Sequence, residues 1–146
     1  LGRYRFLLCA SPAFLAAHPA PTHPRALADL PRIGFRGVKA VPLQRGDESC
    51  LVPFDARLSS NDATAMLGAA LCGAGIAVLP DWLAEDDLAR GTLRVLLPAW
   101  SIPEGEAWVA YRLKGRGQRA VRAVAEHLLA TCAFDRGPRK APSPKR

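Results

Sequence analysis

The sequence has no apolar run as long as the 18 or so residues that a membrane-spanning helix needs. Its first five residues (LGRYR) also lack the long apolar region and the cleavage site of a secretion signal. The four cysteines include no C-x-x-C pair, so the spacing of a zinc ribbon is absent. Because Cys9, Cys72 and Cys132 lie in apolar runs, we expect buried, reduced thiols and a cytoplasmic protein with no membrane partner.

Motifs of catalysis and nucleotide binding are missing as well: there is no G-x-S-x-G elbow, no H-E-x-x-H and no P-loop. Residues 73–75 (GAG) resemble part of a dinucleotide loop, but they close a predicted helix, whereas a phosphate loop opens one. The three acids at 85–87 are typical of the solvated face of a helix. The sequence therefore predicts no catalytic residue, no metal site and no cofactor.

Acidic residues are absent from the end of the chain, and this absence explains most of the net charge of +7. Residues 136–146 carry five Arg and Lys, which leaves 15 bases and 13 acids in residues 1–135. The body is almost neutral, so we expect no basic binding face on it. Residues 134–146 mix Pro, Ser and basic residues without apolar periodicity, which predicts a disordered tail, either inert or able to bind polyanions.

The first third of the chain predicts short elements. Residues 4–9 (YRFLLC) have the composition of a strand. Ser11 is a favourable N-cap and Pro12 suits the first position of a helix, so a helix is expected over 12–17. Short β-leaning segments follow at 32–36, 38–43 and 50–54.

The clearest pattern is an amphipathic helix that begins near Ala63, with an apolar stripe formed by Ala63, Met66, Leu67, Ala70 and Leu71. Ser60, Asn61 and Asp62 supply capping oxygens at its start, and Gly73 and Gly75 end it. A doubly covered strand is expected at 76–79.

The remaining pattern predicts a helix capped by Asp81 and running to about Leu88, and strands at 92–97 and 108–113. A last helix with its apolar face at Val121, Val124 and Leu128 ends near Cys132. The alternation of helices and strands favours an α/β layer.

Two of the predicted helix starts also suggest a binding site. Ser11 begins one helix, and Ser60, Asn61 and Asp62 begin another. Each start presents free backbone N–H groups at the positive end of a helix dipole. If both point into one cleft, they would hold a small carboxylate or a similar anion; the alternative is that these side chains only cap their helices.

Several segments, in order, resemble the effector-binding domain of LysR-type transcriptional regulators. They are residues 5–15 (RFLLCASPAFL), 24–30 (PRALADL), 57–62 (RLSSND), 69–80 (AALCGAGIAVLP), 88–93 (LARGTL), 95–100 (VLLPAW) and 120–124 (AVRAV). The resemblance implies a periplasmic-binding-protein-like (type II) α/β fold, in which two subdomains hold a small effector between them. It implies a crossover strand at 1–9, a complete second subdomain at 10–105 and, at 106–133, a return to a partial first subdomain.

The same resemblance implies a non-catalytic sensor of a small, anionic effector that controls DNA binding. The groups that line the cleft would be Ser11, Ser60, Asn61 and Asp62. Ser60 and Asn61 would donate to the effector, while Asp62 more simply caps its helix. The DNA would be promoter DNA, bound through a winged helix-turn-helix outside this chain by a homodimer or tetramer. Since the chain starts without Met, we expect it to be a piece of a longer protein. Alternatives are a stand-alone solute-binding module and an enzyme of the same fold.

One further expectation concerns the last helix. In the family its apolar face packs on elements of the first subdomain that this sequence does not contain. We therefore expect an exposed apolar patch and self-association of this chain.

Overall fold

The computed structural model describes residues 1–111 and 118–131, and the predicted basic tail at 134–146 lies outside them. Contacts divide the chain into two units, each described here by itself. One unit is Arg5–Glu104. The other combines Leu1–Tyr4 with the residues from Gly105 onward.

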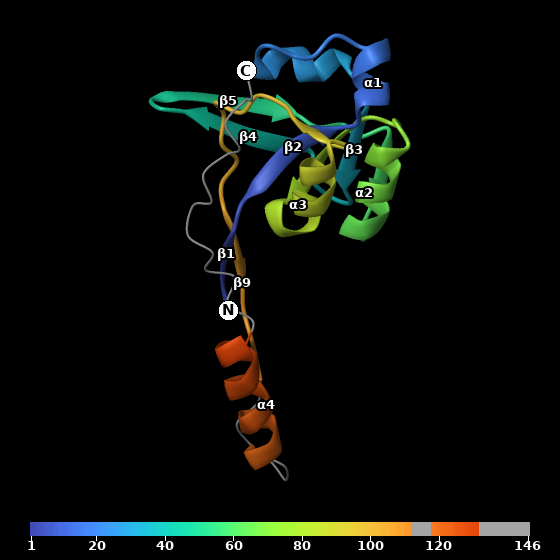
Figure 1. Ribbon diagram of the computed structural model, residues 1–146. Helices are drawn as coiled ribbons and strands as arrows, with labels where there is room; N and C mark the ends of the chain where they lie inside the picture. The colour runs from blue at the N-terminus through green and yellow to red at the C-terminus, as the bar shows by residue number, and fades with distance from the viewer. Residues whose placement is uncertain (112–117, 132–146) are drawn as a thin grey trace. The chain divides into compact units, whose positions relative to one another are not determined.

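The larger unit is built on a five-stranded sheet with the strand order β6-β3-β7-β2-β8 (Figure 1). The strands are β2 (Phe6–Ala10), β3 (Arg32–Phe35), β6 (Leu58–Ser60), β7 (Ile76–Pro80) and β8 (Arg94–Val95). Strands β6, β3 and β7 are parallel, and β2 runs antiparallel to both β7 and β8. The carboxyl end of β2 therefore lies at the same end of the sheet as the amino ends of the parallel strands.

Helices α2 (Ala63–Leu71) and α3 (Asp81–Arg90) cover one face of this sheet (Figure 1). The other face is covered by α1 (Pro12–Ala17), the 3₁₀ helix η1 (Pro24–Asp29) and the hairpin of β4 (Ala40–Arg45) and β5 (Glu48–Pro53). Alternate residues of β7 belong to the two cores: Ile76 packs with Phe14 and Phe54, whereas Ala77 and Leu79 pack with Met66. The prediction of a doubly covered strand is confirmed.

The smaller unit contains β1 (Gly2–Tyr4), β9 (Gly105–Ala107) and α4 (Gln118–Thr131). Strands β1 and β9 pair antiparallel, with Arg3 opposite Glu106. The last helix is confirmed. The predicted strand at 108–113 is wrong for residues 108–111, which form no strand, and its remaining residues lie outside the described ones.

Two other sequence-based predictions need correction. The strand expected at 92–97 shrinks to β8, because Thr92 and Leu93 bond back to Asp87 in α3 and Leu97 opens a turn toward Trp100. Among the cysteines, Cys9 is fully buried, and burial raises the pKa of its thiol to about 12. Cys72 is exposed, since it follows α2 at the point where the apolar stripe ends. Cys132 lies outside the described residues.

Candidate functional site

The start of α2 is ordered by two side-chain bonds. The Thr64 N–H donates to Asp62 Oδ1 over 2.9 Å, and the Asp62 N–H donates to Ser60 Oγ over 3.0 Å. Asp62 is therefore the N-cap, as the sequence predicts. The Ser60 hydroxyl accepts one bond and still has its own proton to donate.

Asn61 lies between these two residues and has a different character. Its side chain is exposed and makes no hydrogen bond within residues 1–111 and 118–131. The amide has two N–H donors, and the helix start beside it carries the positive end of the α2 dipole. This part of the turn is thus able to bind an anionic group from solution.

Ser11 occupies a different place. The residue is 2% exposed, and its Oγ accepts from the Phe14 N–H over 3.3 Å, which caps α1. A Cβ added at Gly73, just after α2, would lie 3.7 Å from that same oxygen. Ser11 therefore packs beside the end of α2, not its beginning.

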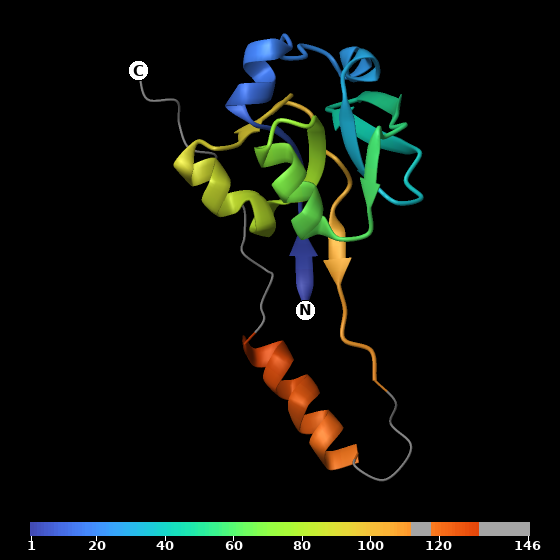
Figure 2. The ribbon, with the colours of Figure 1, turned by 90° about the vertical axis from the view of Figure 1, so that its right-hand side faces the viewer.

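The sheet explains why the two helix starts are apart. Ser60 pairs with Phe35 at the carboxyl ends of the parallel strands. Ala10, just before Ser11, lies at the other end of the sheet, where the parallel strands begin. Figure 2 shows α1 and the start of α2 at opposite ends of the sheet. The structure brings Ser60, Asn61 and Asp62 together and does not bring Ser11 to them.

Two residues beside Ser60, Phe35 and Arg36, were not predicted from the sequence as part of the site. The Arg36 N–H donates to the Ser60 carbonyl over 2.9 Å, and Phe35 lies directly opposite Ser60 in the parallel register. Phe35 is 47% exposed. No local signal could have found them, because the pairing of β3 with β6 joins segments more than 20 residues apart.

Asp81 also lies at this end of the sheet, because Phe6 pairs with Pro80. It is not the cap that the sequence predicts. Pro80 occupies the N-cap position without a capping side chain, and the Asp81 carboxylate pairs with the Arg5 guanidinium over 3.2 Å. The Asp81 N–H bonds to the Arg5 carbonyl over 2.8 Å, so the two residues tie the start of β2 to that of α3.

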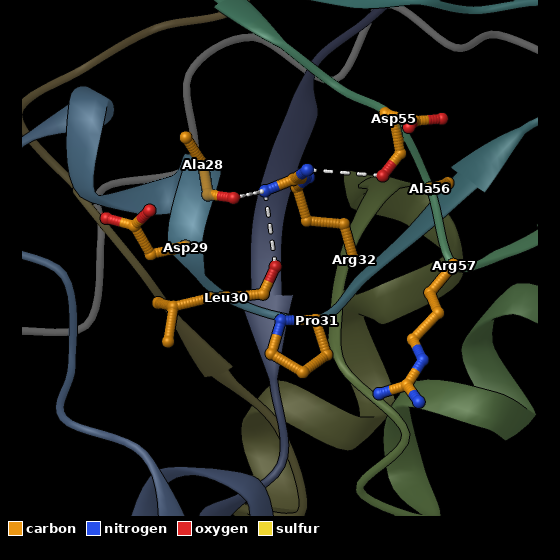
Figure 3. Close-up of a pocket in the computed structure, with 8 residues that line it drawn as sticks. All are labelled: Ala28, Asp29, Leu30, Pro31, Arg32, Asp55, Ala56 and Arg57. Carbon is orange, nitrogen blue, oxygen red and sulfur yellow. Dashed lines mark hydrogen bonds between the residues drawn. The ribbon is translucent and has the colours of Figure 1, made fainter.

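A pocket of about 340 Å³ lies at the opposite end, around Arg32 (Figure 3). The Arg32 guanidinium donates to the carbonyl oxygens of Leu27, Ala28, Leu30 and Asp55. A cation at the carboxyl end of a helix satisfies carbonyls that have no partner within the helix. Arg32 therefore fixes η1 to the sheet through its two Nη groups, whereas its buried Nε has no hydrogen-bond partner in the described part of the chain.

A cluster of Arg45, Glu48 and His23 lies beside the largely buried Trp100. Arg45 lies over the indole with its guanidinium carbon 4.7 Å from the ring centre, and it pairs with Glu48 over 2.7 Å. The hydrogen bond from Arg45, with a smaller contribution from His23, lowers the pKa of Glu48. These contacts join the hairpin to the segment before η1, which is a structural role.

The described residues contain neither a cluster of metal ligands nor a membrane-spanning helix. No three His, Cys, Asp or Glu side chains are placed there to hold a metal ion. Within the same ranges, no helix is both long and apolar enough to cross a membrane.

The fold and this site define an α/β domain that offers a polar helix start, with an aromatic and a basic residue beside it, at one end of a mixed sheet. The family model of the LysR substrate binding domain matches residues 1–133. The chain therefore belongs to this family, and it is an effector-binding domain of the LysR type.

Similar proteins and solved structures support this family assignment. The chain is 34% identical over 122 residues to the HTH-type transcriptional regulator PtxR of Pseudomonas aeruginosa, which covers 82% of the chain and 39% of PtxR. It is 31% identical over 128 residues to the regulator DmlR of Escherichia coli, covering 84% of the chain and 41% of DmlR. The chain thus spans about two-fifths of these relatives.

Among solved structures, the full-length virulence activator AphB of Vibrio cholerae, described as an LTTR family member, matches with a TM-score of 0.67 and 26% identity. That match covers 70% of this chain and 36% of AphB. The regulatory domain of CrgA from Neisseria meningitidis matches with a TM-score of 0.65 and 25% identity, covering 88% of this chain and 64% of that domain. The expected periplasmic-binding-protein-like fold is confirmed.

Proposed function

We propose that this chain senses a small, anionic effector at the Ser60 and Asn61 end of its sheet and thereby controls the DNA binding of a transcriptional regulator. The match of residues 1–133 to the LysR substrate binding domain carries this proposal. The names of the relatives, which are transcriptional regulators, favour a regulator over an enzyme.

The site residues take separate roles in this proposal. Asn61 donates to the effector through its amide, and Ser60 donates through its hydroxyl while accepting the Asp62 N–H. Asp62 keeps the turn in place as the cap of α2. Ser11 caps α1 at the far end of the sheet and does not touch the effector.

The parent regulator would bind promoter DNA through a winged helix-turn-helix outside this chain, as a homodimer or tetramer in the cytoplasm. The effector would act by differential affinity: it shifts the regulator toward the conformation that it binds more tightly. A ligand that binds both conformations equally would leave DNA binding unchanged.

A thermal-shift titration of the full natural protein tests the site, with benzoate, malate and succinate and their amides as probes. We expect at least one probe to raise the melting temperature and to change the affinity for promoter DNA. The Asn61→Ala variant should lose both effects, because the donors of the amide are removed.

Ser11→Ala is the matched control, since Ser11 starts the other helix. It should lower stability by about 1 kcal/mol through the lost cap and leave the effector response intact. An Asn61→Ala variant that responds like the unchanged protein would contradict the proposed site.

A further inference from the structure

The rings of His18 and His23 have opposite hydrogen-bonding roles. His18 Nδ1 lies 3.2 Å from the Phe14 carbonyl oxygen, so this nitrogen carries a proton and donates it. In His23 the Nδ1 atom accepts from the Arg25 N–H over 3.2 Å, so this nitrogen is without a proton. The partner groups therefore assign the two neutral rings to different tautomers.

The other ring nitrogen of His23 faces a carboxylate. Its Nε2 lies 3.4 Å from Glu48 Oε1 and carries the proton of the neutral ring. The hydrogen bond from Arg45 lowers the pKa of Glu48 and keeps it ionised. The charged groups next to the ring are thus Glu48 from β5, Arg45 from β4 and Arg25 from η1. The ring also meets Trp100 edge to face, with centres 5.4 Å apart.

Protonation affects the two histidines differently, because an imidazolium carries a proton on both nitrogens. His18 can still donate to the Phe14 carbonyl. In His23 the new proton on Nδ1 would face the Arg25 N–H, so two donors would meet and this bond would be lost. The contact with Glu48 survives, since Nε2 keeps its proton and the ring gains a positive charge.

The bond that acid removes is the side-chain cap of η1. His23 is its N-cap, and Pro24 at the first position has no N–H, so the Arg25 N–H is the first donor of this helix. The other end of η1 is held by the guanidinium of Arg32, which stays charged at any ordinary pH. Between the two ends, Leu27 is fully buried in the core. Only the first turn therefore depends on a group that titrates.

We propose that His23 is a pH-dependent latch on η1. When neutral, it closes the first turn; when protonated, it releases the Arg25 N–H and stays paired with Glu48. Histidine side chains change charge between pH 5 and 8, so acid in this range should loosen η1. The latch uses none of the residues proposed to bind the effector, so it goes beyond the proposed function and can fail or hold independently of it.

Hydrogen–deuterium exchange of the full natural protein tests the latch, with rates corrected for the intrinsic effect of pH on exchange. Protection of residues 24–29 should fall about fivefold from pH 8 to pH 5, as the loss of one cap predicts. His23→Asn should remove this difference, because an asparagine oxygen also caps a helix and does not titrate.

His18→Asn is the matched control, since His18 donates the same bond in both charge states. It should keep the acid-induced loss of protection in residues 24–29. Equal protection of the unchanged protein at both pH values would overturn the latch, and so would a loss in His23→Asn as large as that of the unchanged protein.

Discussion

At the scale of single residues, Asp87 shows how context decides the role of a charge. The acids at 85–87 look like the solvated face of a helix, but Asp87 is 7% exposed. Its Oδ1 accepts from Thr92 Oγ1 over 2.7 Å and from Arg90 Nη2 over 2.9 Å. The bond from Thr92, followed by that from Arg90, lowers the pKa of Asp87 despite its burial. The carboxylate therefore anchors the segment that follows α3.

This lowered pKa predicts a pH-dependent effect of Asp87→Asn. A group whose pKa is lower in the folded state stabilises the fold above its unfolded pKa and loses this effect as pH falls through the folded value. Urea unfolding should show Asp87→Asn to be less stable by about 1–2 kcal/mol at pH 7. The difference should shrink below pH 4, near the ordinary pKa of an aspartate. A difference that stays constant down to pH 3 would contradict this account.

At the scale of elements, local signals were sufficient where a cap or a breaker set the boundary. Pro12 and Ser11 place the start of α1, and Asp62 places that of α2. The end of α2 follows from Gly73, which has φ +79°, a left-handed conformation that glycine adopts without strain. The strand expected at 92–97 is shorter in the structure, and that expected at 108–113 is absent from residues 108–111, because strand formation depends on a partner at the right register, which composition does not reveal.

Gly75 provides a test at this scale. A Cβ there would lie 2.7 Å from the Pro31 carbonyl oxygen, which itself accepts the Ile76 N–H and aligns β7 with β3. We expect Gly75→Ala to destabilise the fold by about 1–3 kcal/mol, because backbone must move to make room. Gly68→Ala, inside α2 with no atom within 4 Å of the added Cβ, should instead stabilise it by about 0.4–1 kcal/mol. Chemical denaturation of both variants checks the pair.

At the scale of the whole molecule, the two units differ in how well they cover their apolar surface. Arg5–Glu104 encloses two cores. In the smaller unit, the described part of the sheet has two strands, and such a sheet is marginal in water by itself. Val121 is 42% exposed and Val124 59%. Both line an open apolar groove of about 310 Å³ together with Val109 and Leu128.

We therefore expect this chain, produced by itself, to self-associate through the apolar face of α4. Size-exclusion chromatography with light scattering at tens of micromolar should show dimers or larger species. Val124→Glu should shift the distribution toward monomer, because a buried carboxylate without a partner is costly. Ala123→Glu, off the apolar groove, should leave it unchanged. A monodisperse monomer of the unchanged chain would refute the expectation.

The sequence by itself determined the α/β class, the main helices and the family. Caps, glycine breakers and apolar periodicity act over a few residues, so they can be recognised directly in the sequence. It also determined that Ser60, Asn61 and Asp62 share one turn. Only the tertiary structure decided that Ser11 lies at the other end of the sheet, and that Arg36 and Phe35 lie beside Ser60. The antiparallel β2 and the parallel pairing of β3 with β6 fix both results, and strand direction and register arise from contacts between distant segments.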